Sequence, residues 1–120
     1  MRFLAFLVAA ACGAAYASIP AADLALAKKT VGAIELSAAS LTTAVRQKDM
    51  NDFRRFITGP VEAQLDAIRK LPRPQQMELI QCVTAGVEFT NRAEDSMKAG
   101  QVKPANSLEK ESLAACKSLK

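Results

Sequence analysis

The 120-residue sequence contains no histidine and no tryptophan. Without histidine, the chain cannot build a Ser-His-Asp or Cys-His nucleophilic system, a histidine-based metal site or a histidine-ligated haem. It also lacks a glycine-rich phosphate loop, an acidic calcium-binding loop and a dinucleotide-binding fingerprint. We therefore expect a protein that is not an enzyme and that has no catalytic residues, no cofactor and no metal ion.

Carboxylates occur in two close pairs, Glu94 with Asp95 and Glu109 with Glu111. A glycoside-hydrolysing site would need two carboxylates that face each other across a substrate. On a helix, however, residues three or four apart share a face, whereas residues one or two apart do not. The spacing therefore predicts that both pairs lie on solvated helix surface and form no acid–base site.

Aromatic residues are also scarce, and only Phe53, Phe56 and Phe89 lie outside the first 17 positions. Stacking on sugars or nucleic acid bases is therefore poorly provided for. When Arg2 is left out, the chain contains 15 basic and 12 acidic residues, and this small excess of positive charge is scattered along the chain. A nucleic acid partner would need a denser basic surface, so we expect none.

The only long apolar run lies at the N-terminus. Residues 1–17 have the form of a secretory signal peptide, with Arg2, an apolar stretch over residues 3–11 and a small-x-small cleavage site that ends at Ala17. The apolar stretch is shorter than the ~20 residues that span a bilayer, and no later segment is long enough, so we expect no transmembrane segment. The alternative is cleavage just before Cys12, followed by lipidation of that cysteine. The expected location is the periplasm or the extracellular space.

Two cysteines, Cys82 and Cys116, remain in the expected mature chain from residue 18 to residue 120. An even number of cysteines in an exported protein is typical of disulfide bonding. Their spacing lacks the Cys-x-x-Cys pattern of a redox-active dithiol. We predict a Cys82–Cys116 disulfide, which would close a loop of about 35 residues and stabilise the fold by roughly 3 to 4 kcal/mol in the loop-entropy description.

Glycine and proline number only five each, and the apolar half of the chain is mainly alanine and aliphatic. This composition favours helices. The clearest helical pattern covers residues 21–48, where apolar residues alternate three and four apart and form one seam. The residues of this seam are Leu24, Ala27, Val31, Ile34, Ala38, Leu41 and Val45. Its alanines favour close packing inside the chain, and a seam that also forms a homodimer is the alternative.

A short helix is predicted over residues 48–59. Asp49 or Asn51 can cap its start, and Gly59, which is followed by a proline, is expected to end it. Its apolar face follows helical spacing. This face would consist of Phe53, Phe56 and Ile57.

Two longer helices and a C-terminal one follow. The first covers residues 60–71 and ends at a proline-rich corner, because each proline disfavours a helical conformation in the residue before it. The second, over residues 74–99, has two apolar rows and should therefore contact two neighbours. The last begins at Asn106 or Ser107, where Asn106 and Glu109 resemble a capping box.

The helix over residues 74–99 is expected to be central. Its second apolar row consists of Met77, Ile80, Thr84 and Val87. A polar row should face solvent, and it consists of Gln81, Glu88, Asn91, Arg92 and Asp95. Together the patterns predict a single all-α domain over residues 18–120, a small antiparallel helical bundle of about four main helices plus one short helix, with one disulfide.

One basic cluster surrounds the predicted short helix. Arginine beside aromatic residues is typical of protein–protein contacts. The predicted partner-binding residues are Arg46, Lys48, Phe53, Arg54 and Arg55. We therefore expect an exported, non-enzymatic protein-binding module of the inhibitor, immunity or adaptor type, with an acidic protein partner, that is a monomer or a homodimer. Solvated arginines beside buried phenylalanines are the alternative interpretation.

A second function class stays open. A carrier of an apolar ligand, or a membrane-surface protein, would use a cavity between the alanine-rich helices. The expected lining of such a cavity is Val31, Ile34, Leu65 and Val87.

Overall fold

The computed structural model describes residues 19–120. The predicted signal peptide and Cys12 therefore lie outside the described residues. From residue 19 onward the chain forms helices and no strand. In chain order these helices are α2 (Ala21–Gln47), α3 (Met50–Phe53), the π-helix η1 (Arg54–Thr58), α4 (Gly59–Arg69), α5 (Arg73–Glu78), α6 (Ile80–Ala99) and α7 (Ser107–Lys117).

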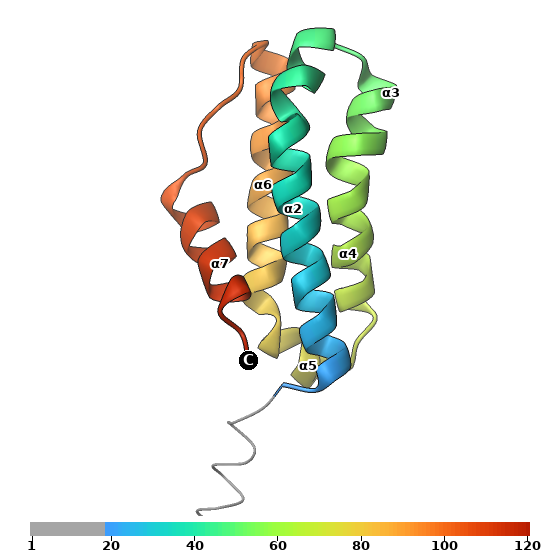
Figure 1. The fold of residues 1–120 in the computed structure, drawn as a ribbon, viewed down its shortest axis with the longest axis vertical. Helices are drawn as coiled ribbons and strands as arrows, with labels where there is room; N and C mark the ends of the chain where they lie inside the picture. The colour runs from blue at the N-terminus through green and yellow to red at the C-terminus, as the bar shows by residue number, and fades with distance from the viewer. Residues whose placement is uncertain (1–18) are drawn as a thin grey trace, which may run out of the picture.

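The long helices run alternately up and down (Figure 1). Because α3, η1 and α4 follow one another without a break, they form one helix, and the bundle has four main helices plus the short α5. α2 lies against both α4 and α6, and α7 packs on α6 and α2. The predicted all-α antiparallel bundle is confirmed. None of the described helices is long and apolar enough to cross a membrane.

The core lies where α2, α4 and α6 meet. One buried cluster joins Ile34 and Leu41 of α2 to Val61 of α4 and Phe89 of α6. A second cluster near α5 contains the two disulfide-bonded cysteines and four further residues, Ala27, Val31, Ile68 and Leu79. Five of the seven residues of the predicted α2 seam are buried in these clusters. The seam is therefore packed inside the chain, as its alanines indicated.

The predicted helix over residues 74–99 is two helices, because the chain bends at Leu79 (φ −101°, ψ 15°). The bend places the Leu79 side chain in the core next to Cys82. Gln76 of α5 then turns back, and its Nε2 donates to the backbone oxygens of Arg69 (3.0 Å) and Leu71 (2.7 Å). These bonds satisfy the carbonyl of the last residue of α4 and that of Leu71 just beyond it, where no further helical turn supplies a donor.

The second apolar row of the predicted central helix lies largely on the surface. Met77, Ile80 and Val87 are exposed, so the expectation of an inward row there is wrong. α6 instead contacts α2, α4 and α7 through a single broad buried face. Gly86 lets α4 approach closely on this face, because a Cβ at this position would lie 2.6 Å from a side-chain carbon of Leu65.

Arg92 and Glu109 form a buried ion pair between α6 and α7. The guanidinium donates to Glu109 through Nε (2.8 Å) and Nη2 (2.9 Å), and through Nη1 to the Lys103 carbonyl (3.0 Å). Only 15% of the Arg92 side chain and 5% of the Glu109 side chain are exposed. The prediction that both residues lie on solvated helix surface is therefore wrong. Each is paired with a residue 17 positions away, which the local spacing of the sequence does not reveal.

The start of α7 is capped as predicted. The Asn106 Oδ1 accepts a hydrogen bond from the Glu109 backbone N–H (2.8 Å). The carboxylate of Glu109 bonds Arg92 instead, so only half of the expected capping box forms.

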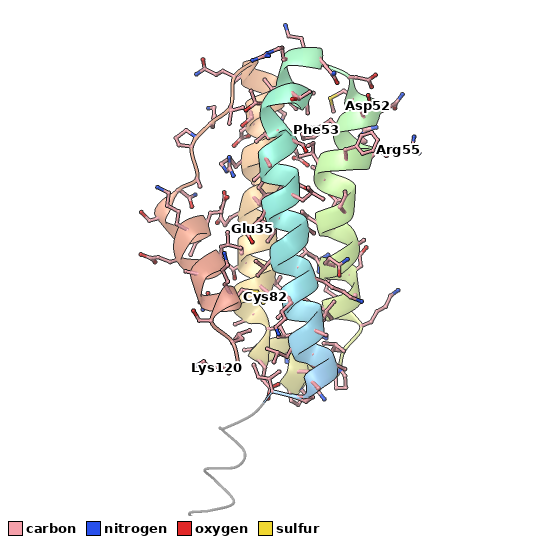
Figure 2. All side chains as sticks on the ribbon, in the orientation of Figure 1. Glu35, Asp52, Phe53, Arg55, Cys82 and Lys120 are labelled. Carbon is pink, nitrogen blue, oxygen red and sulfur yellow. A yellow bond between two sulfur atoms is a disulfide. The ribbon has the colours of Figure 1, made fainter. Side chains whose placement is uncertain are left out.

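The predicted disulfide is confirmed. Cys82 and Cys116 are bonded, their Cα atoms lie 4.9 Å apart, and 34 positions separate them in sequence. Both residues are buried, and the bond joins α6 to the last turn of α7. Figure 2 shows the position of Cys82 on α6.

Replacing both cysteines by alanine should lower the free energy of unfolding by roughly 3 to 4 kcal/mol, because the cross-link restricts the unfolded chain. Urea unfolding of the oxidised wild type and of the Cys82→Ala/Cys116→Ala variant measures the difference. A loss below about 1 kcal/mol would contradict this reason, since it would leave the 34-residue loop without the expected entropic effect.

Glu109→Ala should cost about 3 to 5 kcal/mol of unfolding free energy, because it leaves the buried Arg92 guanidinium without its carboxylate. The matched control is Asp66→Ala, which removes the partner of Arg69 from an ion pair whose side chains are 55% and 64% exposed. That exposed pair should be worth less than about 1 kcal/mol. Equal losses in chemical denaturation would show that burial of the Arg92–Glu109 pair is not what stabilises α7.

Candidate functional site

The helix that contains three of the predicted contact residues, Phe53, Arg54 and Arg55, does not end at Gly59. Pro60 has no N–H, so the Phe56 carbonyl lacks the donor that a regular α-helix would supply. The helix widens into η1 instead, and the Gly59 N–H donates to the Arg54 carbonyl five residues back. Gly59 itself keeps helical dihedral angles (φ −56°, ψ −49°). The predicted break before Pro60 is therefore wrong.

Two neighbours satisfy the backbone of this segment. The Ser37 hydroxyl of α2 donates to the Phe56 carbonyl at 3.4 Å, a long bond. At the start of α3, the Asp49 Oδ1 accepts from the backbone N–H groups of Asn51 (2.9 Å) and Asp52 (3.1 Å). Of the two caps that the sequence allowed, Asp49 or Asn51, the structure uses Asp49. These bonds hold the backbone at the start of α3 and within η1.

The widened turn requires glycine at position 59, because it brings the backbone of this residue close to the Arg54 carbonyl oxygen. A Cβ at this position would lie 2.5 Å from the Arg54 carbonyl oxygen. That oxygen belongs to the backbone of the same helix and cannot move away without breaking its bond to the Gly59 N–H. A side chain larger than hydrogen therefore conflicts with η1.

The three apolar residues predicted to face inward separate into two groups. Phe53 and Ile57 are 2% and 1% exposed and belong to the core. Phe56 is 56% exposed, so its predicted inward position is wrong. The prediction assumed a regular helical period, which the π-turn changes.

Two grooves flank this helix. The larger, between the helix and the end of α6, has a volume of about 680 Å³, and we call it the α6-side groove. The other, between the helix and α2, has a volume of about 420 Å³, and we call it the α2-side groove. The α6-side groove is lined by Met50, Phe53, Arg54, Thr58, Gly59, Glu62, Glu94, Met97 and Lys98. The α2-side groove is lined by Leu36, Ala39, Ser40, Thr43, Ala44, Gln47, Asp52, Phe56 and Ile57.

The predicted contact residues do not gather in one patch. Arg54 lines the α6-side groove, where Phe53 supplies only part of the floor because it is buried. The Arg55 guanidinium lies over the Phe56 ring, 5.5 Å from its centroid, and Figure 2 shows Arg55 on the outer edge of the helix. Arg46 and Lys48 are exposed near the end of α2 and line neither groove.

The charges of the two grooves differ. Arg54 and Lys98 are balanced by Glu62 and Glu94 in the α6-side groove. The α2-side groove has mostly small and apolar walls, with one acidic residue, Asp52. None of the four predicted basic contact residues forms an ion pair with another residue between 19 and 120. Within the same range, no group of three or more potential metal ligands comes together.

Leu36 is the site residue that the sequence analysis did not identify. It lies on the outward face of α2, 71% exposed, at the edge of the α2-side groove opposite Phe56. A signal was present, because Leu36 is a large apolar residue outside the three-and-four spacing of the α2 seam. An apolar residue outside the seam does not pack in the core, so its presence there indicates an exposed apolar contact.

The four residues expected to line the cavity of a ligand carrier lie in different places. Ile34 and Leu65 belong to one core cluster, and Val31 belongs to the other. Val87 is exposed on the surface.

Comparisons of the chain with known protein families, with curated proteins and with solved structures found no match.

Gly59→Ala should destabilise the protein by roughly 1 to 3 kcal/mol, since the added methyl group overpacks the turn against the Arg54 carbonyl. Gly32→Ala is the matched control, because it adds the same group in α2 where a Cβ meets nothing within 4 Å. The control should gain about 0.5 to 1 kcal/mol from helix propensity. Thermal and urea unfolding measure both, and equal changes of the same sign would contradict the close contact.

Proposed function

We propose that this chain is an exported, non-enzymatic protein-binding module that contacts its partner with the residues around η1. We call Arg54, Arg55 and Phe56 the contact ridge, since they are exposed between the two grooves. The observation that carries the proposal is the exposure of Phe56, stacked under Arg55 and facing Leu36 across the α2-side groove.

The aromatic and aliphatic residues of this surface would supply affinity. Exposed Phe56 and Leu36 leave apolar area in contact with water on both sides of a groove. Burying such area is favourable by about 25 cal/mol per Å². Aromatic and arginine side chains are also enriched among the residues that dominate binding energy at interfaces.

The basic residues would favour a partner that presents a carboxylate beside an apolar side chain. The apolar group would lie between Leu36 and Phe56, and the carboxylate would bond Arg55, which forms no ion pair among the described residues. Arg46, Lys48 and Arg54 lie on the same end of the bundle and would steer an acidic surface toward it. Steering of this kind acts mainly on the association rate and weakens with salt.

The support beneath the ridge limits the entropy cost of binding. Phe53 and Ile57 anchor the helix in the core, and Ser37 and Asp49 bond its backbone. A surface that is already ordered loses less conformational freedom when a partner binds.

Export is supported by the N-terminal sequence and by the disulfide. Residues 1–17 have the composition of a signal peptide. Disulfides persist in oxidising compartments and are rare in the cytosol. The periplasm or the extracellular space is therefore the proposed place of action.

Arg54→Glu/Arg55→Glu and Phe56→Ala should each reduce capture of a partner from envelope extract by at least about tenfold, the effect of about 1.4 kcal/mol at a central contact. The matched control is Lys28→Glu/Lys29→Glu, which changes charge by the same amount near the opposite end of α2. The control should capture the same protein as the wild type. Equal capture by all variants would contradict the proposed contact surface. Co-purification of lipid without a protein partner would favour the carrier function instead.

A further inference from the structure

Asp23, in the first turn of α2, is a buried acidic residue without a partner among residues 19–120. Only 7% of it is exposed, and its buried Oδ2 accepts no hydrogen bond from that part of the chain. It belongs to none of the ion pairs found there. Glu109, the other buried acidic residue of the described range, is paired with Arg92. Burying a carboxylate without a partner is costly, so we expect a cation at Asp23.

The local sequence explains why the usual donor is missing. Asp23 is the third residue of α2, a position from which an acidic side chain commonly accepts the backbone N–H of the N-cap residue. The N-cap of α2 is Pro20, which has no N–H. The N–H of Ile19, the residue before it, donates instead to the Lys120 carbonyl in a long bond of 3.4 Å. The helix dipole favours an acid in the first turn, but this effect is small beside the cost of burial.

Cleavage of the predicted signal peptide would create a cation close to Asp23. Hydrolysis of the peptide bond between Ala17 and Ser18 consumes one water and leaves a carboxylate on Ala17 and an ammonium group on Ser18. The Ser18 nitrogen is two residues before the Pro20 nitrogen, and two residues span at most about 7 Å. In the uncleaved chain the same nitrogen is a neutral amide. Cleavage therefore places a charge within reach of the position that an N-cap N–H would occupy.

We propose that Asp23 binds the α-ammonium group of the mature N-terminus at Ser18, so that removal of the signal peptide completes this end of the bundle. The inference rests on the export part of the proposed function and not on the contact ridge. Charge-assisted hydrogen bonds between an ammonium group and a carboxylate are stronger than those of a neutral amide.

The same end of the bundle holds a second bond that depends on export. The start of α2, α5 and the last turn of α7 all lie there (Figure 1), and the Cys82–Cys116 disulfide is in the core cluster near α5. Disulfides form in oxidising compartments. Both stabilising contacts are therefore added only after export, and the precursor is less stable than the mature protein.

The position of the mature N-terminus is the first test. Mass spectrometry of the full-length gene product recovered from the envelope should find a chain that begins at Ser18. A mature chain that begins at another residue would overturn the inference and leave export standing. A chain that keeps residues 1–17 would overturn both.

Urea unfolding then tests the pair itself. The chain from Ser18 to Lys120 contains every described helix, and it is compared with a free and with an acetylated Ser18 amine. Acetylation removes the cation, so it should raise the unfolding equilibrium constant at least about tenfold, which corresponds to about 1.4 kcal/mol. In Asp23→Asn the same acetylation should change this constant by less than about twofold.

The matched control is Asp52→Asn, which neutralises an exposed acid in the first turn of α3. Acetylation should act on this variant as it does on the wild type. Equal effects of acetylation in the wild type and in Asp23→Asn would overturn the inference, and so would an effect below about twofold in the wild type.

A second measurement does not depend on the folding of any variant. The Ser18 amine of the native wild type should react with an amine-reactive ester at least about tenfold more slowly than the same amine in urea, because the ion pair must open first. Equal rates would contradict the pair. Partner capture plays no part in these measurements, so their failure leaves the contact ridge to its own test.

Discussion

The apolar seam of α2 is the constraint on which the bundle depends, because α4, α6, α7 and η1 all pack against this one helix. α2 is 27 residues long, and its core residues alternate three and four apart without interruption. The helix from Met50 to Arg69 packs on this face and widens at η1, where the Ser37 hydroxyl of α2 donates to the carbonyl that Pro60 leaves without a donor.

α7 is held by covalent and ionic contacts as well as by packing. It has only 11 residues, and isolated helices of that length are marginal in water. The disulfide attaches its last turn to α6, and the Arg92–Glu109 pair attaches its first. The guanidinium of Arg92 also bonds the Lys103 carbonyl, so one side chain fixes both the helix and the loop before it.

The proposed contact surface follows from the same packing constraint. Because Phe53 and Ile57 must face α2 and α6 in the core, the residues between them face outward with little choice of orientation. More than half of the Phe56 surface is in contact with water, so this residue contributes less to the core than the buried Phe53 does. In the proposed function, Phe56 is an apolar contact for the partner.

The sequence by itself determined the helices, the Asp49 and Asn106 caps, the α2 seam and the disulfide, because these depend on local spacing, local chemistry or the number of cysteines. It also indicated Arg54 and Arg55 as exposed basic residues of the candidate site. Tertiary structure alone decided that Phe56 faces outward, that Leu36 lies opposite it and that the central helix bends at Leu79. Periodicity assumes a constant rotation per residue, which Pro60 prevents. In the same way, the pairing of Arg92 with a carboxylate 17 positions away depends on the meeting of two helices, which no local pattern encodes.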